Sequence, residues 1–179
     1  MSGSKDAIQI LVAFAHGLLG AFVHLMFTLG AVFAVVGSIT YLAHQANARK
    51  APGQSQGMGK TLALLLICGG LAGLDQVIGA GARQLGWQSA SFEAISYVDV
   101  GTFGVAADAA NAVLTLVRML GVMFALQGML SWKRSLKDGH TGLSAGEDVS
   151  KGTLKFIIGV LCVCNPYLLD AAQKSLGLL

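Results

Sequence analysis

The sequence predicts an all-α integral membrane protein with about four transmembrane helices, of which the last two form a hairpin with a basic link. Of the 179 residues, 54% are hydrophobic and only 12% are charged, and the mean hydropathy is +0.67. This composition is far from that of an ordinary soluble domain. The apolar residues also gather in runs long enough for the hydrocarbon core of a bilayer, which needs about 20 helical residues. A backbone in lipid must satisfy its own hydrogen bonds, so each run is predicted to be a helix.

The first apolar run, Ile8 to Tyr41, is too long for one perpendicular crossing. At about 1.5 Å per residue it would extend for roughly 50 Å as a straight helix. Such a helix must tilt, project beyond the bilayer, or break, and the glycines that could interrupt it are Gly17, Gly20 and Gly30. A polar link from His44 to Lys60 then predicts a separation from the next helix.

The second apolar run, Thr61 to about Ala82, is predicted to be the next span. The mixed segment that follows, Gln84 to Asp99, suits an interfacial position, because aromatic side chains anchor proteins at the membrane surface. The third helix is predicted to begin between Thr102 and Asp108 and to end near Trp132. The aromatic residues of the interfacial segment are Trp87, Phe92 and Tyr97.

The C-terminal part, Leu114 to Ala172, is predicted to be a hydrophobic hairpin. Its second arm contains Pro166, which should kink or end the span within about a turn. We expect an N-terminal pair of apolar helices with the interfacial segment, residues 1–100, and a hairpin, residues 101–179, in one compact unit. The link between the two arms carries Lys133, Arg134, Lys137 and Lys151.

The distribution of basic residues predicts the topology, because Lys and Arg are retained on the cytoplasmic side during insertion. The first and third links are basic, while the middle link has Arg83 against Glu93 and Asp99. With four spans, both basic links lie in the cytoplasm and both termini lie in the periplasm. The basic residues of the first link are Arg49, Lys50 and Lys60, and Lys155 lies just inside the fourth span.

One polar stripe is predicted within the third span. Asp108, Asn111, Thr115 and Arg118 follow helical spacing and therefore share a face. A charge inside a span costs several kcal/mol unless it is paired, so this face should look toward protein. We expect intramembrane pairing among Asp75, Asp108 and Arg118 that holds helices together, and a proton or ion pathway is the alternative interpretation.

No catalytic, cofactor or metal site is predicted. Gly59-Lys60-Thr61 resembles the end of a phosphate-binding loop, but the required first glycine is replaced by Gln54. His16 and His24 are too far apart for a metal site with so few other ligands. Nothing in the sequence indicates a nucleic-acid site. The cysteines lie in apolar runs and are expected to be small buried hydrophobes: Cys68, Cys162 and Cys164.

Small residues are spaced for close helix contact, either within the chain or between copies. In lipid, such ridges let backbones approach closely where burial alone offers no driving force. The glycines predicted to pack helices are Gly17, Gly69, Gly73 and Gly121.

The stretch Gly101 to Leu176 carries V-R-M-L-G-V-M-F-A-L-Q-G-M-L, a Lys/Arg-rich link, and N-P-Y-L-L-D-A. This pattern, with Gly121, Phe124 and Gly128 before the link, resembles the small inner-membrane proteins of type IVB secretion systems, the Dot/Icm apparatus. It also resembles their counterparts of the TraQ and TraR kind in I-type conjugative plasmids. The resemblance implies a structural part of a conjugation or secretion machine in a bacterial inner membrane. Its partners would be other membrane proteins of that machine and further copies of itself.

The hairpin is also similar in plan to conjugative pilins of other type IV systems. In those pilins the subunits leave the membrane to form a helical tube and carry phospholipid with them. The similarity implies an extracellular pilus and lipid headgroups beside Lys133, Arg134, Lys137 and Lys155, although two extra spans depart from the pilin plan. Basic residues near anionic headgroups contribute about 1 kcal/mol each, which favours phospholipid binding on physical grounds as well. The alternative function is a small membrane channel or transporter that uses the polar stripe.

Overall fold

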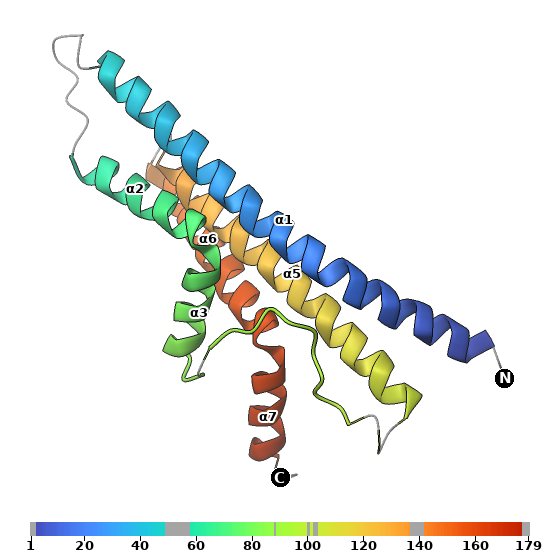
Figure 1. Cartoon of the computed structure of the whole chain (residues 1–179). Coiled ribbons are helices and arrows are strands. Elements are labelled where there is room, and N and C mark those ends of the chain that lie inside the picture. The colour runs from blue at the N-terminus through green and yellow to red at the C-terminus, as the bar shows by residue number, and fades with distance from the viewer. Residues whose placement is uncertain are drawn as a thin grey trace.

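The computed structural model describes residues 3–48, 58–87, 89–99, 101, 104–136 and 142–176. These residues form helices joined by turns and one extended segment, and no strand occurs among them, which confirms the all-α prediction (Figure 1). The helices are α1 (Gly3–Ala48), α2 (Met58–Ala72), α3 (Leu74–Gln84), α5 (Val105–Ser135), α6 (Gly142–Val163) and α7 (Asn165–Ser175).

The predicted membrane character is confirmed. Two helices are long and apolar enough to cross a membrane, α1 over Ala7–Asn47 and α5 over Ala106–Ser135. Two further pairs, α2 with α3 and α6 with α7, are bent by 95° and 78° at short breaks, and each pair adds a span if it is counted as one. The described part of the chain therefore holds two to four candidate spans.

The structure resolves how the two long apolar runs behave. The first run is one uninterrupted helix of 46 residues, so none of its glycines breaks it. The second run is not one helix, because it breaks at Gly73, whose backbone has φ −110° and ψ 48°. In the fourth span the break lies at Cys164, and Pro166 occupies the first turn of α7, as its effect on a helix predicted.

The long helices run side by side in a defined register. A Cβ placed on Gly30 would lie 3.6 Å from a methyl group of Leu126, and one on Gly37 would meet Lys133, so residues 96 positions apart face each other. This constant offset means that α1 and α5 are parallel, as Figure 1 shows. The helices that follow them, α2 and α6, return in the opposite direction, so α1 and α5 end, and α2 and α6 begin, at the same end of the bundle.

The tightest contact in the bundle joins α5 to α6 through glycines. A Cβ on Gly121 would lie only 2.7 Å from the Gly159 carbonyl oxygen, and one on Gly128 only 2.7 Å from the Gly152 carbonyl oxygen. From the first pair to the second, the position on α5 rises by seven residues while the position on α6 falls by seven. The residue numbers in each pair therefore sum to 280, as expected for antiparallel helices in one register. The absence of side chains here lets the two backbones touch, which is how helices gain dispersion contacts in lipid.

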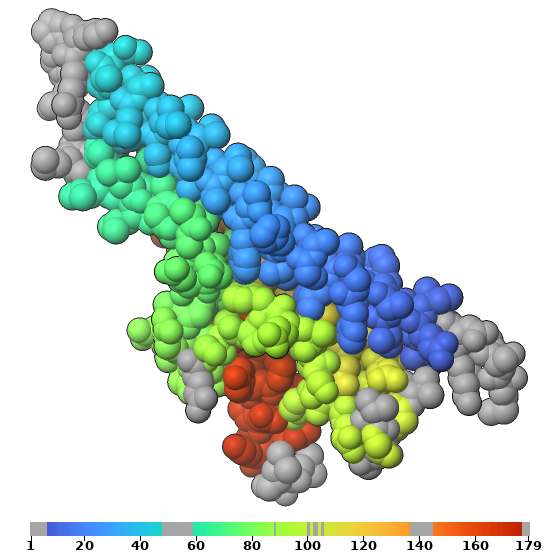
Figure 2. Space-filling model, in the orientation of Figure 1, coloured from blue at the N-terminus to red at the C-terminus, as the bar shows by residue number. Residues whose placement is uncertain are grey.

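A single hydrophobic core connects the N-terminal and C-terminal parts of the chain. Buried residues from α1, α2, α3, α5 and α6 contact one another in this core. The extended segment 89–99 lies across the bundle, between α1 and α7 in the space-filling view (Figure 2). The core members with the least exposure include Leu71, Leu74, Ile78, Val122, Ala125 and Val163.

Candidate functional site

The most concentrated group of buried polar side chains lies on α5. Asn111, Thr115 and Arg118 are all buried on one face of this helix, and Arg118 is only 5% exposed. Their spacing of four and three residues places them one above another. They face segment 89–99, whose backbone is in neither a helix nor a sheet. Buried backbone groups need hydrogen-bond partners, and these side chains supply partners to several of them.

Asn111 and Thr115 hold the middle of this segment. The Asn111 Oδ1 atom accepts hydrogen bonds from the backbone N–H groups of Tyr97, at 3.0 Å, and Val98, at 2.9 Å. The Asn111 amide also donates to the Val98 carbonyl at 2.9 Å. Thr115 accepts from the Ile95 N–H at 3.1 Å and donates to the Asn111 carbonyl of its own helix. The side chains of α5 thus act as a hydrogen-bonding template for an extended strand of backbone.

Arg118 connects three elements. Its Nε donates to the carbonyl of Val163, the last residue of α6, at 3.1 Å. Its guanidinium also donates to the Glu93 carbonyl. The Val163 carbonyl is open to a side-chain donor because the Tyr167 N–H bonds Cys164 instead. Arg118 therefore fixes the broken end of α6 and the extended segment to α5.

The junction between α6 and α7 carries further polar contacts. The Asn165 amide donates to the Leu114 carbonyl at 2.8 Å, while its Oδ1 is buried without a partner within the described residues. The rings of Trp87 and Tyr167 stack with their centroids 6.0 Å apart. These contacts hold α7 against the segment that leads into α5.

The aromatic residues expected at the interface are used for packing and bonding. The Phe92 ring meets Phe27 of α1 edge to face, with centroids 5.0 Å apart. The Tyr97 hydroxyl donates to the Asp170 carboxylate of α7 at 2.8 Å. Desolvation and then this hydrogen bond raise the pKa of Tyr97. Both residues tie the extended segment to helices that are distant in sequence.

The structure does not bring the three charges of the predicted pairing together. Asp75 is exposed on α3, and Asp108 is half-buried at the start of α5. Both hydrogen bonds of Arg118 go to backbone carbonyls instead. The physical reason is the helix break, because a broken helix end supplies strong acceptors that need no second charge.

The described basic residues among those predicted to meet lipid headgroups do not form one cluster. Lys133 is half-buried and donates to the Phe33 carbonyl of α1 at 2.6 Å, whereas Arg134 is exposed. Lys155 lies on α6, eight residues beyond the position that the glycine register places opposite Lys133. This separates the two levels by about 12 Å along the helix axis. Lys137 lies outside the described residues.

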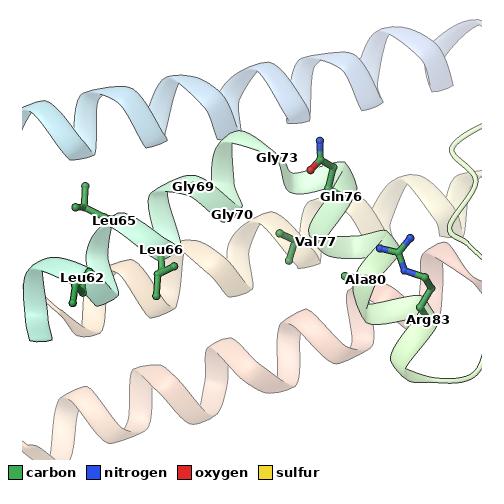
Figure 3. Close-up of a pocket in the computed structure, with 10 residues that line it drawn as sticks. All are labelled: Leu62, Leu65, Leu66, Gly69, Gly70, Gly73, Gln76, Val77, Ala80 and Arg83. Carbon is green, nitrogen blue, oxygen red and sulfur yellow. The ribbon is translucent and has the colours of Figure 1, made fainter.

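The four glycines predicted to pack helices have different surroundings. Gly121 lies in the α5–α6 contact, while a Cβ on Gly17 or Gly69 would have no atom within 4 Å. Gly69 and Gly73 line an open, largely apolar groove of about 660 Å³ at the bend between α2 and α3 (Figure 3). Arg83 projects at the α3 end of this groove.

Several residues that matter here were not predicted from the sequence. Gly152 and Gly159 repeat the seven-residue spacing of Gly121 and Gly128, and this match was the available signal. Asn165 had no signal beyond its position before Pro166. His44 lines a cavity at the end of α1 and had no pattern to mark it.

The described residues hold no cluster of metal ligands and no disulfide. No group of three or more potential metal ligands occurs among them. All three cysteines are free thiols, with Cys68 and Cys164 buried as expected. No protein-family model, curated protein or solved structure matches this chain.

Proposed function

We propose that this chain is a non-enzymatic, self-associating membrane subunit of a type IVB conjugation or secretion apparatus. The observation that carries the proposal is the apolar face that α1 leaves uncovered. This face extends from Ile10, 70% exposed, to Leu42, 47% exposed. The distance between these residues is about 48 Å along the helix.

The hydrocarbon core of a bilayer cannot cover the whole of this face. Its hydrocarbon core is about 30 Å thick. Even at a tilt of about 40°, the upper end of the usual range, 48 Å of helix projects about 37 Å along the bilayer normal. Exposed apolar surface beyond the lipid marks a protein contact. We therefore assign part of the outer face of α1 to contact with another subunit.

The N-terminal half of α1 suits such a contact. A Cβ on Gly17 or Gly20 would meet no atom within 4 Å, and Ala13 and Ala21 on the same helix are exposed. A second helix could approach closely along these small residues. The resemblance of the C-terminal hairpin supports placing such an assembly in a bacterial inner membrane. In the pilin form of the proposal the chain is the filament subunit, and sequencing protein from sheared surface filaments tests it.

Gly17→Leu is expected to leave the fold intact and to break the assembly, because the new side chain has free space within the protomer but occupies the contact surface. The measurement is the mass of the detergent-purified complex by native mass spectrometry, with helical content by circular dichroism. The control is Gly146→Leu, which also places leucine in open space. A wild-type protein that is monomeric, or a Gly17→Leu complex of unchanged mass, contradicts the proposal.

The proposal includes a topology with both termini periplasmic and both basic links cytoplasmic. A cysteine at Asn47, exposed near the end of α1, is then expected to be protected from a membrane-impermeant thiol reagent in spheroplasts. A cysteine at Ser89, exposed in the middle link, is expected to be labelled. Both should react after lysis, and the reverse pattern in spheroplasts would reject this orientation.

The alternative of a channel or transporter has no specific support from the described residues. It was motivated by the polar stripe on α5. The side chains of this stripe form hydrogen bonds with the backbone of segment 89–99 and with the end of α6. A stripe used in this way is an element of packing, so we do not propose transport as a second function.

A further inference from the structure

A cavity of about 260 Å³ lies at the end of the bundle that is formed by the C-terminal ends of α1 and α5 and by α2. Its walls come from three helices, α1, α2 and α5. They include Thr40, Tyr41 and His44 of α1, Leu64 of α2, Lys133 of α5, and Leu136, which directly follows α5. The cavity therefore combines cationic and hydroxyl groups with two leucine side chains.

The ammonium group of Lys133 is held at a fixed position beside this cavity. It donates one hydrogen bond to the Phe33 carbonyl at 2.6 Å. An ammonium has three N–H donors, so two remain for a ligand. Gly37, which also lines the cavity, makes this position available, because a side chain there would collide with the end of Lys133.

The other walls define the ligand. Tyr41 and His44 add polar groups to the same lining as Lys133, whereas Leu64 and Leu136 offer apolar surface. A phosphodiester attached to acyl chains uses both kinds of wall, while inorganic phosphate uses only the polar one. The cavity also lies beside the last turns of the apolar run of α1, where lipid headgroups meet the hydrocarbon. We propose that it binds the phosphate group of an acidic phospholipid, with Lys133 as the principal ligand.

This site differs from the basic cluster that the sequence suggested. Of the three described residues in that set, Lys133, Arg134 and Lys155, Lys133 is the one that lines the cavity. Its neighbour Arg134 is exposed and is not part of the lining. The proposed lipid site requires only that the chain is inserted in a membrane. It does not depend on the proposed secretion role, so an experiment can reject either proposal without rejecting the other.

Lys133→Gln is expected to reduce the phosphatidylglycerol that co-purifies with the protein in mild detergent by about fivefold, the change expected for one basic residue at an anionic headgroup. Arg134→Gln removes the same charge one residue away and should retain lipid within about twofold of wild type. The lipid is quantified by mass spectrometry per mole of protein. Equal losses in both variants, or no loss in Lys133→Gln, would overturn the proposal.

A second variant separates the cavity from the charge. Thr40→Trp keeps every cation and fills the cavity from an exposed position of α1, so it should also lose phosphatidylglycerol while helical content is unchanged. If Lys133→Gln fails to fold, Thr40→Trp alone tests whether the cavity binds lipid. Full lipid retention in Thr40→Trp would refute the site. On delipidated wild type, short-chain phosphatidylglycerol should raise the melting temperature. An equal rise with inorganic phosphate or short-chain phosphatidylcholine would reject an acidic lipid.

Discussion

Gly121→Leu is expected to destabilise the folded protein by about 3 kcal/mol or more, at the upper end of the range for overpacked cores. A Cβ at this position would lie 2.7 Å from both the Gly159 oxygen and the Val163 nitrogen. Both atoms belong to the backbone of α6, so they cannot turn aside as a flexible side chain would. The two helices must separate, and the dispersion contacts along their whole interface weaken with them.

Unfolding in mixed detergent micelles provides the measurement. The control is Leu120→Ala, because Leu120 is adjacent in sequence but 48% exposed, and its truncation should cost less than about 1 kcal/mol. Gly159→Leu should behave like Gly121→Leu, since it meets the Ala125 nitrogen at 2.6 Å from the other side of the same contact. Equal stability of Gly121→Leu and Leu120→Ala would show that the two helices do not pack in this register.

Composition and run length were sufficient to predict the class of fold. Apolar runs and basic links are averages over many residues, and the physical requirement behind them, an apolar surface in lipid, leaves few alternatives. The break at Gly73 was not predictable in the same way. Glycine is frequent in membrane helices that do not break, as Gly17, Gly20 and Gly30 of α1 illustrate. Whether a glycine ends a helix depends on what the next turn can pack against, here α6 beneath α3.

The candidate site was predicted in part for a similar reason. The spacing of Asn111, Thr115 and Arg118 was enough to place them on one protein-facing side of α5, and they are buried there. Their partners could not be identified, because these are backbone groups of residues 93–98 and of Val163, and backbone groups carry no sequence signature. The predicted partners of Arg118 were acidic side chains, whereas its acceptors are the backbone carbonyls of Val163 and Glu93.

Arg118→Met is expected to detach segment 89–99 from the bundle. Methionine fills much of the same volume but donates nothing, so the Val163 and Glu93 carbonyls lose the donor that the structure gives them. Val163 is fully buried, and leaving a buried polar group unsatisfied costs about 1–3 kcal/mol. Part of this cost is offset because the variant no longer buries a charge. The extended segment should respond most, since it has no helix or sheet of its own to retain it.

Hydrogen exchange measures this effect at named amides. The N–H groups of Ile95, Tyr97 and Val98 are bonded to Thr115 and Asn111, so they stay protected only while the segment remains seated on α5. In Arg118→Met they should exchange at least about tenfold faster, which corresponds to about 1.4 kcal/mol of local opening.

Arg83→Met is the control, because Arg83 is exposed on α3 and its loss should leave these amides unchanged. Arg118→Lys should give an intermediate rate, since one ammonium keeps the charge but lacks the planar fork that reaches two carbonyls. If the three amides remain protected in Arg118→Met, Asn111 and Thr115 hold the segment without help. Arg118 would then serve only the broken end of α6.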